Sequence, residues 1–233
     1  SVDTETNSLD PHQAELVGVS LCSKIGKACY IPIAHKSSKC IKKDIVIKKL
    51  KPLLEDPSVK KIGQNIKFDF IVLYKQGIII SSMEDTMLMS YVLDAGKNRH
   101  NMDTLSEIHL GHKTISFKEI VGSGKKEINF SDVEIDIAKD YAAEDADITF
   151  RLYKKFTKDL KLEKMINIYE IFEKPLIEIL AFMEMEGIEV NSKFLKSLSS
   201  KFEKKIKNLE KEVFKISKKE FNIASPKQLG EII

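Results

Sequence analysis

The sequence predicts an α/β protein, with a mixed sheet flanked by helices and followed by an all-helical C-terminal segment. Three observations predict this fold class. The first third of the chain alternates strand patterns with turn residues, the middle alternates helical and strand patterns, and the region after about Lys161 is helical throughout. With 233 residues, 42% hydrophobic and 31% charged, the chain suits one large domain, or one domain with an appendage.

The first elements are three strands. One short strand starts at Val2, and the apolar stretches Leu16–Cys22 and Ala28–Ile33 give two more. The residues Lys24–Lys27 between them have the composition of a hairpin turn. We therefore expect an antiparallel meander.

The middle of the chain alternates helices and strands. Asp44–Glu55 has apolar residues near helical spacing, and Val59–Gly63 should be a short strand that rejoins the sheet in parallel. Helices are expected over Phe68–Lys75 and Met83–Leu93, with a strand over Gly77–Ile80 between them.

The pattern weakens from about Arg99 to Phe130, where glycines break it into short helices and loops. The segment Gly122–Lys126 (GSGKK) has only a superficial likeness to a phosphate loop, because it lacks the GxxxxGK[ST] spacing, and we expect a flexible connection. Val133 to about Leu160 then reads as one long helix that closes the sheet.

The last part of the chain reads as helices. Gly187 ends a first helix, Asn191 or Ser192 caps a second one, and Ser225-Pro226 starts a third. The second helix has a narrow apolar stripe flanked by lysines, so we expect only one of its sides to be packed. This segment is too thin to form its own core, and both chain ends are expected to be cuts from something larger.

Composition excludes several classes of protein. The chain has neither a run of eighteen apolar residues nor a signal peptide, so we expect a cytoplasmic protein without a membrane partner. Its three cysteines are odd in number and form no CxxC pair, so neither a disulfide framework nor a zinc site is indicated. The net charge is only +3, so charge alone does not indicate a nucleic-acid-binding protein.

Four acids are candidates for chemistry. Asp3 and Glu5 lie two apart on a strand, so their side chains point to the same side and could share a cation. Asp69 lies near the first turn of a helix, where it could cap the helix or act as a ligand. Tyr141 and Asp145 are one turn apart on the long helix, and an ionised Asp145 within the apolar stripe is costly without a cation.

Four carboxylates, two on one strand and one on each of two helices beside the same sheet, are what a two-metal phosphodiesterase needs. Oxygen ligands suit Mg²⁺ or Mn²⁺. Two such ions, about 4 Å apart, stabilise the attacking and the leaving oxygen of an in-line displacement.

The order Asp-x-Glu, Asn-x-x-Phe-Asp, Tyr-x-x-x-Asp resembles the three motifs of the DEDDy group of 3′-5′ exonucleases. Longer strings are similar to the proofreading exonuclease domain of bacterial DNA polymerase I: DTETNSLD (3–10), LKPLLED (50–56), GQNIKFD (63–69), HKTISFKEI (112–120) and YAAEDADIT (141–149). The likeness continues through residues 173–191, which resemble the opening of the polymerase thumb region. It implies a ribonuclease H-like exonuclease domain at 1–161 and a truncated helical thumb base at 162–233.

The resemblance also implies individual roles. Asp3, Glu5 and Asp145 would hold one divalent ion, Asp3 would bridge to a second, and Asp69 would hold that second ion largely through water. Tyr141 would aim the attacking water. The residues expected to contact the terminal bases or the terminal nucleotide are Thr4, Leu9, Asn65 and Phe117.

The implied substrate is a single-stranded or frayed 3′ end of DNA, in a bacterial, nucleoid-associated setting. The implied partner is the remainder of a DNA polymerase I chain. Since no polymerase catalytic motif is present, we expect no primer extension. Two alternatives remain: a ribonuclease D-like RNA exonuclease, which would share the metal site but not the thumb-like segment, and a catalytically silent scaffold, against which the intact acids weigh.

Overall fold

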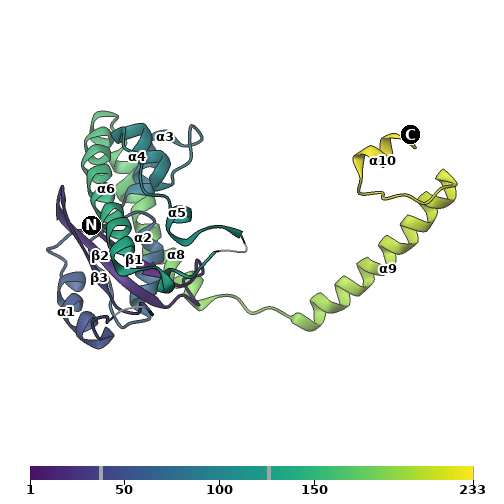
Figure 1. The fold of residues 1–233 in the computed structure, drawn as a ribbon. Coiled ribbons are helices and arrows are strands. Elements are labelled where there is room, and N and C mark those ends of the chain that lie inside the picture. Colours follow the sequence, from purple (N-terminus) through teal and green to yellow (C-terminus); the bar gives the residue numbers. More distant parts are fainter. Residues whose placement is uncertain (37–38, 125–126, 233) are drawn as a thin grey trace. The chain divides into compact units, whose positions relative to one another are not determined.

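The computed structural model describes residues 1–36, 39–124 and 127–232, which form two compact units, Ser1–Glu186 and Gly187–Ile233. The first unit contains an antiparallel sheet of β1 (Val2–Thr6), β2 (Leu16–Lys24) and β3 (Lys27–Pro32), in that order. This confirms the expected meander (Figure 1).

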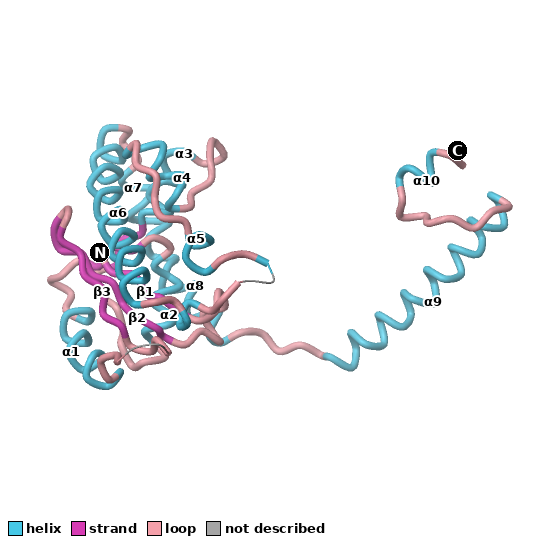
Figure 2. Tube along the Cα trace, in the orientation of Figure 1, coloured by secondary structure: helices cyan, strands magenta, loops and turns pink. Residues whose placement is uncertain are grey.

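Helices cover this sheet and build three apolar clusters. The long helix α6 (Ile135–Leu162) packs against β2 and β3, and α2 (Ile66–Tyr74) packs against β1 and against α8 (Lys174–Glu186). Figure 2 shows the helices surrounding the small sheet. The first unit also contains α1 (Lys43–Glu55), α3 (Thr86–Asp94), α4 (Met102–Leu110), α5 (Phe117–Val121), the 3₁₀ turn η2 (Phe130–Asp132), α7 (Ile166–Ile168) and the π-helical turn η3 (Tyr169–Glu173).

A second, two-stranded sheet corrects two of the expected elements. The strand β4 (Lys61–Gly63) does pair in parallel, but its hydrogen-bonded partner is β5 (Met83–Asp85) and not the meander. The helix expected from Met83 therefore begins three residues later, because the Asp85 side chain accepts hydrogen bonds from the backbone N–H groups of Met87 and Leu88 and caps α3.

The strand expected over Gly77–Ile80 was wrong. These residues form turn and loop structure, although Ile78 and Ile80 are buried in the core beside the sheet. Gly77 has a φ of 78°, which ends the preceding helix and interrupts any extended run. Hydrophobicity alone therefore marked this segment as buried without fixing its backbone conformation.

The second unit consists of α9 (Ser192–Ser217) and α10 (Pro226–Gly230). The expected caps are confirmed, because the side chains of Asn191 and Ser225 accept hydrogen bonds from the backbone N–H groups of Phe194 and Gln228. No residue of α9 is buried, and most of its apolar stripe is exposed within the described part of this unit. Residues 162–186, placed with the helical segment in the sequence analysis, group with the first unit by their contacts.

Within the flexible connection expected over Gly122–Lys126, Lys125 and Lys126 lie outside the described residues. In the described ranges, every helix is too short or too polar to cross a membrane.

The buried carboxylate of Glu84 joins β5 to the helices that follow α6. Its oxygens accept hydrogen bonds from Lys60 Nζ at 3.0 Å, Lys174 Nζ at 2.9 Å and the Tyr169 hydroxyl at 3.0 Å. The Glu84 side chain is 2% exposed, whereas that of Lys60 is 60% exposed. A desolvated charge held by three donors thus anchors η3 and α8 to β5.

Replacing Glu84 with glutamine is expected to lower the free energy of unfolding by about 1–3 kcal/mol, because a buried, charge-assisted set of hydrogen bonds loses its charge. Urea denaturation at pH 7.5 measures the change. Glu170→Gln is the matched control, since Glu170 also pairs with Lys174 but its side chain is 43% exposed. That control should change stability by less than about 0.5 kcal/mol, and equal effects of the two variants would contradict the prediction.

Candidate active site

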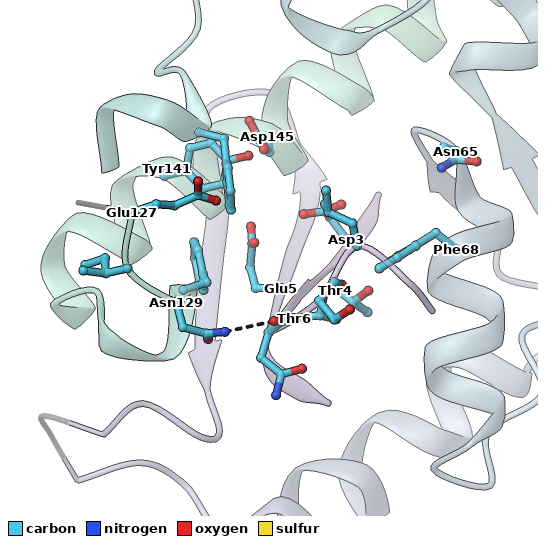
Figure 3. Close-up of a pocket in the computed structure, with 16 residues that line it drawn as sticks. Asp3, Thr4, Glu5, Thr6, Asn65, Phe68, Glu127, Asn129, Tyr141 and Asp145 are labelled. Atoms are coloured by element: carbon cyan, nitrogen blue, oxygen red, sulfur yellow. Dashed lines mark hydrogen bonds between the residues drawn. The ribbon is translucent and has the colours of Figure 1, made fainter. Parts of the chain in front are cut away.

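Three acids from two elements meet at one end of the first unit. Asp3 and Glu5 come from β1 and Asp145 comes from α6, and each offers a carboxylate oxygen within 4.8 Å of the others. Figure 3 shows these side chains around one pocket, with Tyr141 next to Asp145. Asp3 and Glu5 share a side because they are two apart on a strand, and the packing of α6 against the sheet brings Asp145 to them.

Burial and mutual repulsion shape the electrostatics of this group. Burial raises the pKa of Asp3 to about 6. The pKa of Glu5 lies well above its ordinary value, first because of burial and then because of the charges of Asp3 and Asp145. Burial and the charge of Asp3 likewise raise the pKa of Asp145. Three carboxylates held this close favour either protons or a cation between them.

The residues present fit a divalent cation. Glu5 is 7% exposed, and its Oε1 atom is buried without a hydrogen-bond partner among the described residues. An unpaired buried carboxylate oxygen is costly, and a cation shared with Asp3 and Asp145 would satisfy it. The all-oxygen donor set favours Mg²⁺ or Mn²⁺ over softer metals.

Asp69 lies on α2 beside this group and is not one of the three clustered acids. It is 2% exposed, and its Oδ1 atom accepts hydrogen bonds from the backbone N–H of Thr4 at 2.8 Å and from the Thr4 hydroxyl at 2.6 Å. Burial and the nearby charge of Asp3 raise the pKa of Asp69. The contact with Thr4 fixes Asp69 to β1, next to Asp3.

Tyr141 lies one helical turn before Asp145 and is held by aromatic neighbours. Its ring lies 6.1 Å from the rings of both Phe117 and Phe130, measured between centroids. Burial and the charge of Asp145 raise the pKa of the Tyr141 hydroxyl, so it stays protonated at neutral pH. A protonated phenol can donate a hydrogen bond and accept another.

An open pocket of about 680 Å³ lies over the acids, and all four expected substrate contacts line it. Leu9 is 90% exposed, and the ring of Phe117 stacks on Phe130 with a centroid distance of 6.2 Å and an angle of 6° between planes. Thr4 and Asn65 line the same pocket. An exposed apolar side chain and an aromatic face beside clustered acids suit a base next to a phosphodiester.

The pocket is also lined by residues that the sequence did not indicate as site residues. Phe68 directly precedes Asp69 in the second motif, so its position was a usable signal, and Figure 3 shows it on the Asn65 side of the pocket. Asn129 had no signal, because it lies in the weakly patterned region. Its side-chain N–H donates to the backbone oxygen of Asn7 at 2.9 Å, which ties the loop before α6 to the end of β1. The other additions are Thr6, Asn7, Ser8, Glu127, Ile128 and Phe130.

Comparisons with known proteins identify the family of the chain. A protein-family model described as "3′-5′ exonuclease" matches residues 1–161. DNA polymerase I of Rhizobium leguminosarum is 44% identical over 99% of this chain, and that of Pseudomonas aeruginosa is 41% identical over 99%. The chain spans about a quarter of the length of these relatives, 25% and 26% respectively.

Solved structures show the same ribonuclease H-like fold. A polymerase-domain structure of Pol1 from M. smegmatis, in complex with DNA primer-template and dNTP, has a TM-score of 0.79 at 21% identity and covers all of this chain and 36% of its own. NrnC of Brucella melitensis, solved with bound Mg²⁺, has a TM-score of 0.61 at 24% identity and covers 82% of this chain and 88% of its own. The family match over residues 1–161 shows that the chain belongs to the 3′-5′ exonuclease family, and the relatives it resembles are DNA polymerase I proteins.

Proposed function

We propose that this domain removes nucleotides from a single-stranded or frayed 3′ end of DNA with the help of two divalent ions, Mg²⁺ or Mn²⁺. The observation that carries the proposal is the unpaired, buried Oε1 of Glu5, which lies among clustered carboxylates at a pocket with the exposed Leu9 and Phe117 on its walls. Acids alone would fit many phosphodiesterases. The apolar and aromatic wall is what favours an unpaired nucleic-acid end.

Each acid has a role in this proposal. Asp3, Glu5 and Asp145 would hold one ion, and Asp3 and Asp69 would hold the second. Two ions in such a site supply charge stabilisation for the attacking and the leaving oxygen of the displacement. The separate role of Asp69 is supported by its position beside the three clustered acids and by the two hydrogen bonds that its Oδ1 atom accepts from Thr4.

The remaining residues bind and orient the substrate. Tyr141 directs the attacking water with its protonated hydroxyl. Leu9 wedges against the terminal bases and Phe117 stacks on one of them, a contact that is blind to sequence because every base has a π-face. Thr4 and Asn65 contact the terminal nucleotide from β1 and from the start of α2.

We further propose that the domain proofreads within a longer polymerase chain. The support is the match to DNA polymerase I over nearly the whole chain, including residues beyond 161. Residues 162–233 would then be the start of the thumb region, and the remainder of the polymerase would be its covalent partner. Such a protein acts at the bacterial chromosome and is therefore expected to be nucleoid-associated.

Incubation of the purified chain with 3′-labelled single-stranded DNA and Mg²⁺ or Mn²⁺ tests the proposal. We expect release of labelled 5′-mononucleotides, and none after chelation of the metal with EDTA. The same assay on RNA of equal sequence separates DNA proofreading from ribonuclease D-like trimming. Preferred cleavage of RNA would favour ribonuclease D-like trimming, and no cleavage of either DNA or RNA would favour the silent scaffold.

A further inference from the structure

Asp85, at the end of β5, caps two helices at once. Its Oδ1 atom accepts hydrogen bonds from the backbone N–H groups of Met87 at 2.8 Å and Leu88 at 3.4 Å, at the start of α3. The same carboxylate accepts from the backbone N–H of Asn65 at 3.1 Å and, through Oδ2, from that of Ile66 at 3.0 Å, at the start of α2. Asp85 is 1% exposed, so these four donors replace its solvent.

The turn whose N–H groups donate to Asp85, residues 63–66, is strained and leads into the pocket. Asn65 has a φ of 63°, in the left-handed region that few non-glycine residues adopt and that asparagine adopts most readily among them. A Cβ atom on Gly63 would lie 2.7 Å from the Cβ atom of Ile66, so the chain turns too tightly there for any side chain. A conformation of this kind persists only where its surroundings fix it.

Neighbours of Asp85 hold the same turn. The hydroxyl of Thr86 lies within hydrogen-bonding distance of two acceptors, the backbone oxygen of Gly63 at 3.1 Å and Oε1 of Gln64 at 2.5 Å, and its single proton serves one of them at a time. The side-chain amide of Gln64 donates to the backbone oxygen of His100 at 2.8 Å. The turn from β4 to α2 is therefore tied to β5 and to the loop before α4.

We propose that Asp85 is a positioning residue of the exonuclease site: it fixes the turn that presents Asn65 to the terminal nucleotide. The inference rests on the proposed function, because it assumes that Asn65 contacts the substrate. Asp85 itself does not line the pocket and acts only through the backbone of Asn65 and Ile66.

A carboxylate is required at this position by its chemistry. Both oxygens of an ionised Asp85 accept, whereas an asparagine has one accepting oxygen and an NH₂ group that only donates. In Asp85→Asn that NH₂ group would replace one of the two accepting oxygens. It would then face either the N–H of Ile66 or the N–H groups that donate to Oδ1, so that a donor meets a donor. Serine is a good helix cap but is shorter, so Asp85→Ser keeps an acceptor for α3 while losing its reach to the turn.

The experiment compares Asp85→Asn and Asp85→Ser with the control Glu84→Gln. Glu84 is the preceding buried carboxylate on β5, but it holds Tyr169, Lys60 and Lys174 instead of the turn. All variants are assayed on single-stranded DNA well below their Tm. We expect each Asp85 variant to raise KM about tenfold, the size of a lost substrate contact, whereas Glu84→Gln lowers Tm and leaves KM within about twofold.

A double-mutant cycle with Asn65→Ala identifies the route of the effect. If Asp85 acts through Asn65, the KM of Asp85→Asn/Asn65→Ala equals the higher of the two KM values of the single variants. The effects of Glu84→Gln and Asn65→Ala on KM, by contrast, multiply. Affinity for the same DNA in Ca²⁺, which is expected not to support cleavage, should follow KM. Asp85→Ser replaces Asp85→Asn in the cycle if the asparagine variant does not fold.

The outcomes separate the two claims. Multiplicative combination of the Asp85 and Asn65 effects, or an unchanged KM in both Asp85 variants, would overturn the positioning role while the wild-type chain still degrades DNA. A wild-type chain that neither binds nor degrades DNA would overturn the proposed function, and this inference with it.

Discussion

Replacement of Asp3 or Asp145 with alanine is expected to abolish degradation of DNA from its 3′ end, with a loss of at least about 10³-fold in kcat/KM. Each substitution would remove a ligand of the ion that stabilises the reacting oxygens. The structure motivates the size of this effect. Both carboxylates belong to the three-acid group and lie beside the unpaired Oε1 of Glu5.

Asp136→Ala is the matched control for this prediction. Asp136 lies on α6 like Asp145, but its side chain is 93% exposed and it does not line the pocket. Release of labelled mononucleotides gives the rate, and Mn²⁺ binding followed by electron paramagnetic resonance gives the metal affinity. We expect Asp3→Ala and Asp145→Ala to lose both and the control to lose neither. Activity within tenfold of wild type in either site variant would refute the assignment of these acids.

Divalent metal is expected to stabilise the folded protein strongly at pH 8 and only weakly at pH 5. Without metal, the pKa values of Glu5, Asp69 and Asp145 lie well above their ordinary values and that of Asp3 is about 6. Above about pH 4, these four acids therefore bind more protons in the folded state than in the unfolded state. By linkage, stability is lost as pH rises through the folded-state pKa values, and a bound cation reverses that loss.

At a free Mg²⁺ concentration one hundred times its Kd, the gain at pH 8 should be about 2.7 kcal/mol. Urea denaturation with and without Mg²⁺, at matched ionic strength, measures this gain. The lowered pKa values of His35 and His109 make stability rise with pH. That contribution is the same with and without metal and cancels in the difference.

Glu5→Gln provides an internal check of this electrostatic account. It removes one of the repelling carboxylates, so at pH 8 the metal-free variant should be more stable than metal-free wild type, and it should gain less from Mg²⁺. A gain from Mg²⁺ that is equal at pH 5 and pH 8 would contradict the prediction, as would a metal-free Glu5→Gln that is less stable than wild type.

The sequence by itself predicted the acids of the candidate site and most of the elements that carry them. Glu5 follows Asp3 by two residues on a strand, and Asp145 follows Tyr141 by four on a helix, so local periodicity fixes which side chains share a face. The meander and the long helix were predictable because their patterns extend over many residues. The strands β4 and β5 have three residues each, too few for a period to show, and the pairing of β4 was therefore assigned to the wrong sheet.

Only the tertiary structure decided how these residues meet. The hydrogen bond from Thr4 to Asp69 joins residues 65 apart in the chain, and that from Asn129 to Asn7 joins residues 122 apart. The two helix caps of Asp85 depend on β5 lying beside β4. The physical reason is that periodicity and residue chemistry act over a few neighbouring residues. The distance between carboxylates on β1 and α6, by contrast, results from the packing of a helix on a sheet.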